Sequence, residues 1–295
     1  MADIPVINVD AYIPSEMAKR VEAVGISKAN LFGLNMFLLA ILAGVFIGFG
    51  AWISTVVTSD SNLSFGLTRL LAGLVFCLGL ILVVVAGAEL FTGNNLIIMA
   101  FASKKIGIGL LLKNWLIVYI GNLFGSLSLV YLVYYSKAWS FGNNVVGGRA
   151  ILIANSKVNL GFIEALILGI LCNALVCLAI WLCFSARSVT DKILAILFPI
   201  TTFVAAGFEH SVANMFFIPM GILLTNQPKA VEAADLLAKK ATGLDNLNIL
   251  GFIKNLVPVT LGNIIGGAIL VGFIYWFIYI RPAKYPIIKT RSKKP

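Results

Sequence analysis

Apolar residues fill most of the chain in six long runs, which short polar stretches separate. Four of these runs have the length that one helix needs to cross a hydrocarbon core of ~30 Å. They lie at about 31–57, 108–136, 159–184 and 250–280. The other two, at about 66–103 and 192–225, are too long, because a straight helix of ~35 residues would extend ~50 Å. Neither contains the polar turn that two full crossings require. We therefore predict an all-α membrane protein with six spans, of which spans 2 and 5 are broken at mid-depth.

A polar segment interrupts each of the two overlong runs. The first covers residues 87–95, and the second covers residues 207–214 and contains His210, the single histidine of the chain. Both follow the pattern G-x-E-x-x-x-x-N, at the matched positions Gly87, Glu89 and Asn94, and Gly207, Glu209 and Asn214. Lipid cannot satisfy the backbone groups that a broken helix exposes, so each break is expected to line a cavity.

Further matches extend this similarity over two halves of the chain. One set of matched positions consists of Asn114, Gly121, Asn122 and Gly125, and of Asn255, Gly262, Asn263 and Gly266. A second set, at the same spacing, consists of Phe37, Ala40 and Gly44, and of Phe162, Ala165 and Gly169. The sequence thus predicts two three-span repeats, at about 30–136 and 159–280, and because three is odd the second is inverted. Broken helices at corresponding positions of inverted repeats indicate a transport site.

The composition agrees with a membrane protein. Of the 295 residues, 60% are hydrophobic and 12% are charged, and the mean hydropathy is +1.00. A soluble domain of this length has too little interior for so much apolar surface. The long continuous runs also exclude a transmembrane β-barrel, whose strands alternate apolar and polar residues. No cleavable signal peptide is expected, because residues 1–28 are polar and the first apolar run begins after Asn30.

Polar ends frame the six-span domain at 30–280. Residues 1–29 form an N-terminal segment in which Ser15 is a candidate cap for a short helix, and residues 281–295 form a basic tail. The net charge of +10 arises from lysines and arginines near span ends and in this tail, which suits a membrane surface and not nucleic acid. Most of these residues lie on the side that both termini share, which predicts cytoplasmic termini.

The candidate chemistry lies at the two breaks. The half-helices after them should point N–H groups and positive dipole ends toward mid-membrane, which favours a small anion or polar solute. His210, with a reference pKa of ~6.5, is a candidate donor of a hydrogen bond or a proton to the solute, against the alternative of a satisfied core histidine. Thr92 in the facing loop is a second candidate contact. Glu89 and Glu209 are expected to anchor the loops by accepting backbone N–H bonds, since a carboxylate in the path would repel an anion.

Other residues are candidates for the path and its support. Amides expected to hydrogen-bond broken backbone or neighbouring helices are Asn122, Asn173, Asn214 and Asn263, and Asn263 is also a candidate for the path. Apolar side chains near the breaks are candidate constrictions against hydrated ions, namely Phe76, Leu80, Phe91 and Phe203. Lys157, just before span 4, either gathers anions at the periplasmic mouth or anchors the helix at the membrane surface.

No pattern indicates an enzyme, a metal site or a cofactor. The four cysteines all lie in apolar runs and form no CxxC pair. The chain also has no nucleophile–base set and no cofactor motif. We therefore expect no enzymatic activity and no bound cofactor.

These motifs resemble the formate–nitrite transporter family over about residues 14–280. The resemblance rests on GAELFT at 87–92, NW and VYIGN within 114–122, CNALVCLA at 172–179, GFEHSVANM at 207–215 and PVTLGNIIGG at 258–267. Within the family the chain is most similar to formate channels, on FCLGLIL at 76–82, SARSVTDK at 185–192 and FFIPM at 216–220. The resemblance implies an aquaporin-like protomer with its own pore, a homopentamer in the bacterial cytoplasmic membrane, and contact with lipid.

The same resemblance implies roles for individual residues. Solute contact is implied for Thr92 and His210, constriction for Phe76, Leu80 and Phe203, and assistance to the path for Lys157 and Asn263. We therefore expect passive or proton-coupled passage of formate through each protomer. Nitrite or hydrosulfide is an alternative permeant, and so is a neutral solute such as water or ammonia. Formate channels often carry histidines just after the loop lysine, where this chain has Asn159 and Leu160, so its periplasmic mouth departs from the family pattern.

Overall fold

The computed structural model describes residues 10–281, and within them the fold is entirely helical. Residues 1–9 and the expected basic tail, apart from Arg281, lie outside the described residues. The first helix, α1, covers Pro14–Ala29. Ser15 does not cap it, because the helix begins one residue earlier with Pro14 at its first position, where the fixed φ of proline suits a helix start.

Six helices within the described part are long and apolar enough to cross a membrane. They are α2 (Gly33–Thr58), α3 with η1 (Phe65–Gly87), α6 (Ile108–Tyr135), α8 (Phe162–Cys183), α9 (Val189–Ala206) and α12 with η4 and α13 (Ile249–Tyr279). Two shorter apolar helices follow the second and fifth of these spans, namely Phe91–Ala102, made of α4, η2 and α5, and α10 (Ser211–Leu224). The predicted fold class is therefore confirmed, including the two broken spans.

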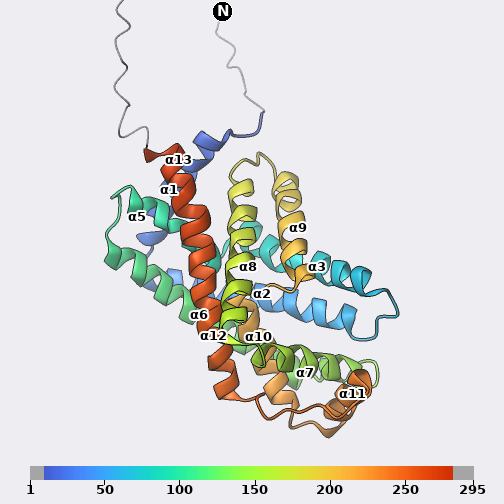
Figure 1. Ribbon diagram of the computed structural model, residues 1–295. Helices are drawn as coiled ribbons and strands as arrows, with labels where there is room; N and C mark the ends of the chain where they lie inside the picture. Colours follow the sequence, from blue (N-terminus) through green and yellow to red (C-terminus); the bar gives the residue numbers. More distant parts are fainter. Residues whose placement is uncertain (1–9, 282–295) are drawn as a thin grey trace, which may run out of the picture.

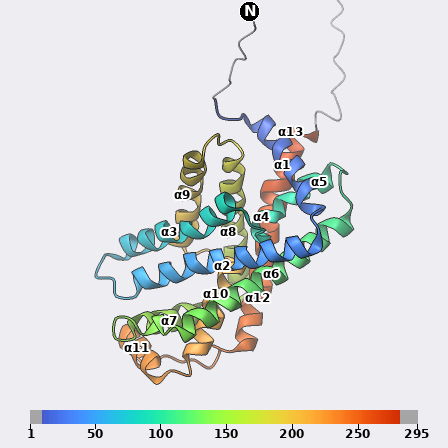
Figure 2. The same cartoon turned by 180° about the vertical axis from the view of Figure 1, so that it is seen from behind.

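Some spans consist of several segments with different helical geometry. These segments are α3 (Phe65–Ile81), η1 (Leu82–Gly87), α4 (Phe91–Asn94), η2 (Asn95–Ile97), α5 (Ile98–Ala102), α12 (Ile249–Ile264), η4 (Ile265–Phe273) and α13 (Ile274–Tyr279). Three further helices lie outside the spans, namely η3 (Ala138–Ser140), α7 (Val145–Val158) and α11 (Pro228–Ala238). Helices α1, α5 and α13 lie at one end of the molecule and α7 and α11 at the opposite end (Figure 1). The same arrangement is visible from behind (Figure 2), and we refer to the α1 end and the α11 end.

Each break begins at a glycine in the left-handed backbone region. Gly87 has φ 88° and Gly207 has φ 81°, values that a side chain would make costly. In both repeats the three residues after this glycine are not helical, and the half-helix then starts at Phe91 or Ser211.

The two repeats superpose in a register that differs from the expected one in their first spans. The backbone N–H of Glu89 donates to the carbonyl of Leu39, and that of Glu209 donates to the carbonyl of Leu168. Ala40 therefore corresponds to Gly169, and not to Ala165 as the spacing of glycines and apolar residues indicated. A shift of four residues is about one helical turn. It leaves the same face toward the neighbouring helix, so the sequence pattern alone does not distinguish the two registers.

The last span carries a π-helix, η4, that its counterpart α6 lacks. The side-chain amide of Asn173 donates to the backbone carbonyl of Asn263 at 2.6 Å, just before η4. This side-chain hydrogen bond enters the helical ladder at the point where the turns of the last span widen. Gly44 occupies the corresponding position in the first repeat and has no side chain to make this contact. This contact is one point at which the repeats differ, and a second is η1, a π-helix whose counterpart within α9 is a regular α-helix.

Large apolar side chains cover much of the outer surface of the spans. Exposed examples on α2, α3, α6, α8 and α12 are Leu38, Leu70, Leu116, Ile167 and Ile253. An apolar belt of this extent is typical of a surface that faces lipid or neighbouring protomers. Together with the six spans it makes the chain a multi-pass membrane protein.

Candidate functional site

The structure brings His210 and Thr92 into direct contact at the centre of the molecule. The Thr92 hydroxyl lies 2.9 Å from His210 Nε2, and both side chains are buried. His210 also caps α10, because its Nδ1 accepts the backbone N–H of Ala213 at 3.0 Å. A ring nitrogen that accepts a hydrogen bond carries no proton, so the proton of the neutral imidazole resides on Nε2. His210 therefore presents an N–H donor toward Thr92.

The two loop glutamates form equivalent ion pairs on opposite sides of this centre. Glu209 accepts from Lys157 Nζ at 2.6 Å, and Glu89 accepts from Lys28 Nζ at 2.8 Å. The second carboxylate oxygen of each accepts from the asparagine five residues later, Asn214 or Asn94, at 2.6 Å. These donors are side chains and not the backbone N–H groups that the sequence analysis expected, while the anchoring role of the two glutamates stays a prediction. The donors are side chains that reach the loops from α7, α1 and the half-helices.

Lys28 is a member of this arrangement that the sequence reasoning missed. It lies five residues before the start of α2, and Lys157 lies five residues before the start of α8. This equal spacing in the two repeats is visible in the sequence and could have identified Lys28 as the counterpart of Lys157. Lys157 itself is largely buried, with 13% of its side chain exposed, and its amine is committed to Glu209.

Asn122 and Asn263 support the two loops in the same way. The Asn263 amide donates to the carbonyls of Gly169 and Glu209 at 2.8 and 3.0 Å, and its oxygen accepts the N–H of Ser211 at 2.9 Å. Asn122 makes the corresponding contacts with Ala40, Glu89 and Phe91. Asn263 is fully buried and lines neither of the vestibules described below. The geometry therefore shows the supporting contacts of Asn263, and its place in the path stays a prediction.

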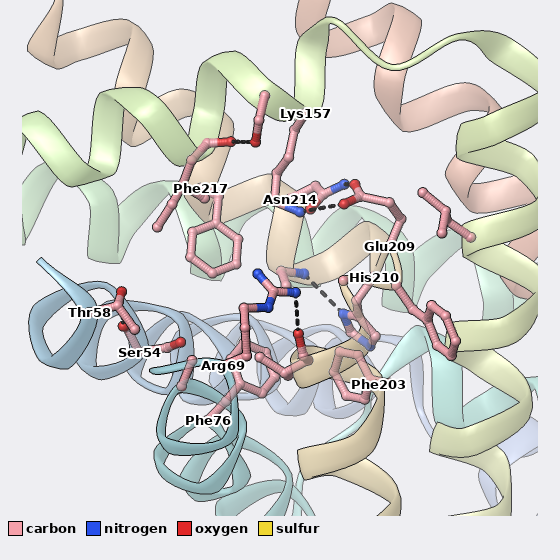
Figure 3. A pocket seen from close by; sticks show the side chains of 18 of the residues that line it. Ser54, Thr58, Arg69, Phe76, Lys157, Phe203, Glu209, His210, Asn214 and Phe217 are labelled. Atoms are coloured by element: carbon pink, nitrogen blue, oxygen red, sulfur yellow. Dashed lines mark hydrogen bonds and ion pairs between the residues drawn. The ribbon is translucent and has the colours of Figure 1, made fainter. Parts of the chain in front are cut away.

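Two vestibules approach the centre from the ends of the molecule. The vestibule at the α11 end has a volume of about 240 Å³, and Figure 3 shows several of its lining residues, among them Arg69, Phe76, Lys157, Phe203 and His210. The vestibule at the α1 end has a volume of about 500 Å³ and is lined by Lys28, Glu89 and Leu90, among others. Each vestibule is lined by three cationic side chains and one carboxylate, so both carry net positive charge. Such a potential favours the entry of anions.

An apolar constriction separates the two vestibules. A void of only about 10 Å³ lies between them, lined by Ile47, Phe76, Leu80, Leu90, Val176, Ile200, Phe203 and His210. The rings of Phe76 and Phe203 meet edge to face at 5.6 Å, and the Phe203 ring stacks on His210 at 5.9 Å. Three of the four expected constriction residues, Phe76, Leu80 and Phe203, are thus brought together around the histidine.

Phe91, the fourth, lies elsewhere. Its ring packs against Tyr119 at 4.8 Å and Trp115 at 6.3 Å, both on α6, and Leu90 lines the constriction in its place. Leu90 is the residue that matches His210 in the repeat. Phe91 is the first residue of α4, and Leu90 directly before it has an extended backbone.

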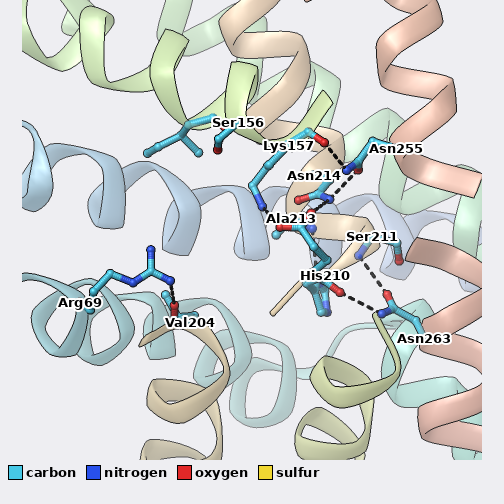
Figure 4. Close-up of polar contacts among 12 residues, drawn as sticks. Arg69, Ser156, Lys157, Val204, His210, Ser211, Ala213, Asn214, Asn255 and Asn263 are labelled. Carbon is cyan, nitrogen blue, oxygen red and sulfur yellow. Dashed lines mark hydrogen bonds and ion pairs between the residues drawn. The ribbon is translucent and has the colours of Figure 1, made fainter. Parts of the chain in front are cut away.

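Two arginines of the α11-end vestibule were not singled out from the sequence. Arg69 lies in the fifth position of α3 and donates from Nη2 to the carbonyl of Val204 at 2.7 Å and from Nε to that of Ala205 at 2.9 Å (Figure 4). Arg149 lies on α7 and lines the same vestibule. An arginine inside an apolar span is costly and marks a functional or structural site. Arg69 lies within an apolar run of the sequence, and this position could have marked it as a candidate. Arg149 lies outside the six apolar runs, so the sequence contained no such mark for it.

Comparison with known proteins identifies clear relatives. The model of a protein family described as formate/nitrite transporter matches residues 15–277. Formate channel FocA of Escherichia coli (strain K12) is 46% identical over 274 residues, which cover 92% of this chain and 96% of the relative. Formate channel FocA of Haemophilus influenzae is 39% identical over 265 residues, which cover 89% of this chain and 93% of the relative.

Solved structures give the same picture. A structure described as a pentameric formate channel with formate bound is similar with a TM-score of 0.77 and 45% identity, covering 84% of this chain and 97% of that chain. A second, described as an FNT family ion channel, has a TM-score of 0.75 and 27% identity, covering 90% of this chain and 99% of that chain. These relatives are channels or transporters and not enzymes, so the expectation that the chain has no enzymatic activity is confirmed.

Proposed function

Because this chain belongs to the formate/nitrite transporter family, we propose that it is a channel for small monovalent anions, and for formate in particular, with one path through each protomer. The observation that carries this proposal is the pair of positively charged vestibules that approach, from opposite ends, the apolar constriction in which His210 contacts Thr92. An N–H donor in a closed apolar constriction stabilises an anion only when the anion is small enough to reach it. The path therefore runs from one vestibule past Phe76 and Phe203, across His210 and Thr92, and past Leu80 and Leu90.

Formate can cross the constriction as the anion or as neutral formic acid, and the cost of desolvation differs between the two. An anion that loses its water in an apolar ring incurs a large desolvation cost, and a neutral acid incurs much less. His210 is the titratable side chain in that ring, so we infer that formate is protonated there: the ring takes a proton from the vestibule solution at Nδ1, once the Ala213 N–H bond opens, and gives its Nε2 proton to formate, which leaves a neutral imidazole. Between passages the Thr92 hydroxyl accepts the Nε2–H hydrogen bond of His210. Electroneutral passage as formic acid is the consequence.

The assembly and location follow from the relatives. The similarity to a pentameric formate channel supports a homopentamer, with the apolar belt of the spans divided between subunit contacts and lipid. The bacterial relatives support the cytoplasmic membrane as its location. The distribution of lysine and arginine supports an orientation with the α1 end in the cytoplasm and the α11 end in the periplasm.

Formate flux into proteoliposomes tests the function. Vesicles with purified protein should take up labelled formate faster than protein-free vesicles, and parallel uptake of nitrite and hydrosulfide ranks the permeants. Flux of water or ammonia without any flux of the three anions would replace the proposal with a neutral-solute channel.

The proton coupling needs its own measurement. Formate uptake against a lumenal pH indicator should acidify the lumen and should not depend on a potassium–valinomycin clamp of the membrane potential. His210→Gln keeps an N–H donor but cannot titrate, so its uptake should become electrogenic and respond to the clamp. Wild-type uptake that already follows the clamped potential contradicts proton coupling but leaves anion transport intact.

A further inference from the structure

The α11-end vestibule contains a partly buried guanidinium, that of Arg149, which has no ion-pair partner among the described residues. Within the described part of the chain Arg149 belongs to neither of the two ion pairs, and its buried Nε has no hydrogen-bond partner. The one carboxylate among the lining residues is that of Glu209, and its two oxygens already accept from Lys157 and Asn214. Burial and then the nearby positive charge of Arg69 lower the pKa of Arg149, which again reflects a guanidinium without a counter-charge. Such a group is costly unless a ligand from solution completes it.

Arg69 differs from Arg149 in being fixed in place. Its two hydrogen bonds hold the last carbonyls of α9, directly before the break at Gly207. A guanidinium held from one side keeps its remaining N–H group available to the cavity. The vestibule therefore presents one positioned guanidinium from α3 and one unpaired guanidinium from α7, next to the Phe76–Phe203 constriction.

We propose that Arg69 and Arg149 form an anion-loading site, which binds a small carboxylate or a similar planar oxyanion before it reaches His210. The planar fork of a guanidinium matches the two oxygens of a carboxylate, which an ammonium group does not. Lys157 cannot substitute for it, because its amine is committed to Glu209. The inference rests on the proposed anion transport and adds to it a binding step on the α11 side.

The site is tested by the concentration dependence of formate uptake, measured with the full-length protein oriented so that formate enters from the α11 side. Arg149→Gln removes the charge without removing any hydrogen bond or ion pair of the described chain. We expect it to raise the half-saturating formate concentration about tenfold, the ratio that ~1.4 kcal/mol gives. The maximal flux should stay within about twofold, because a lost binding contact that does not act in the rate-limiting passage changes affinity and not turnover.

Two further variants control for general charge and for folding. Lys240→Gln removes an exposed positive charge at the same end but outside the cavity, and should leave the half-saturating concentration unchanged. Arg149→Lys keeps the charge and loses the fork, and should fall between wild type and Arg149→Gln. It also serves as the second test should the glutamine variant not assemble, since a half-saturating concentration equal to that of wild type would overturn the guanidinium site.

The outcomes separate this inference from the proposed function. An unchanged concentration dependence in Arg149→Gln, or an equal shift in Lys240→Gln, overturns the loading site while wild-type formate flux still supports the channel. Absence of formate flux in the wild type itself overturns both.

Discussion

At the scale of single residues, the central histidine is defined by what its two nitrogens contact. Nδ1 is engaged by the Ala213 N–H and so fixes the tautomer, and Nε2 is left to meet Thr92. The histidine is thus a positioned hydrogen-bond donor in a ring of phenylalanine and leucine side chains. A solute that displaces the Thr92 hydroxyl finds the donor already oriented, which lowers the reorganisation that binding requires.

Thr92→Val tests this contact with little change in side-chain volume. It leaves the Nε2–H of His210 without an acceptor inside the protein, and an unmade buried hydrogen bond costs ~1–3 kcal/mol. Formate flux should fall about tenfold, and Thr92→Ser should restore most of it, because serine retains the hydroxyl. Equal flux in Thr92→Val and wild type would show that the hydroxyl takes no part in passage.

The two lysine–glutamate pairs are equivalent in the repeat but differ in burial. The Lys157 side chain is 13% exposed and that of Lys28 is 29% exposed. Removing either lysine leaves a buried carboxylate with a single asparagine donor, and breaking a buried pair costs ~3–5 kcal/mol. Lys157→Met should therefore lower the midpoint of thermal unfolding in detergent more than Lys28→Met. The reverse order would contradict burial as the deciding factor.

At the scale of elements, close contact between spans within each repeat holds the broken helices. Gly125 of α6 lies against the carbonyl of Ile41 on α2, and Gly266 lies in the same way against Ile170 on α8. Each contact lets an asparagine on the same helix, Asn122 or Asn263, reach the loop that precedes the half-helix. Small residues at these positions are therefore a condition for the geometry of the site.

Gly125→Ala and Gly109→Ala compare two glycines on α6. A methyl group at Gly125 would overlap the Ile41 carbonyl, whereas nothing lies within 4 Å of the corresponding position at Gly109. Overpacking costs ~1–3 kcal/mol, so Gly125→Ala should unfold at a lower temperature and lose formate flux. Gly109→Ala should stabilise by ~0.5–1 kcal/mol through helix propensity. Similar stability of the two variants would mean that α2 and α6 can separate without cost.

At the scale of the whole molecule, the inverted repeat places a vestibule at each end and the break loops between them. The α1 end is held by contacts between the N-terminal segment and the loop before α9. In this loop Arg187 donates to the Tyr12 hydroxyl, and the Ser185 carbonyl accepts the Tyr12 N–H. At the α11 end α7 packs against α11 (Figure 1), and α7 also lines the vestibule through Arg149 and Lys157, among others. The two ends thus differ in construction although the spans between them are related by symmetry.

The proposed orientation is tested by cysteine labelling in intact cells. The four native cysteines are buried, so single exposed cysteines report their own side of the membrane. Lys240→Cys at the α11 end should react with a membrane-impermeant maleimide added outside. Lys105→Cys, between α5 and α6, should react only after the membrane is permeabilised. Labelling of Lys105→Cys in intact cells would reverse the orientation.

The sequence by itself determined the six spans, the two breaks and the inverted repeat. The thickness of the hydrocarbon core sets the length of a span, so the two overlong apolar segments cannot be single straight helices. The polar run inside each of them marks the place where the helix breaks, and the exposed backbone there must face protein or water because lipid cannot satisfy it. The same pattern identified Glu89, Glu209 and His210, because ionisable residues at mid-membrane are rare for energetic reasons.

Only the tertiary structure decided which of these residues meet. It showed side-chain donors to the glutamates, gave Asn263 the same supporting contacts as Asn122, and exchanged Phe91 for Leu90 in the constriction. It also brought Arg149 of α7 beside Arg69 of α3, from separate parts of the chain. Helical periodicity fixes the face of a residue but not its partner across a span, and a slip of four residues preserves that face. Contacts between distant spans depend on close packing in three dimensions, which no local pattern records.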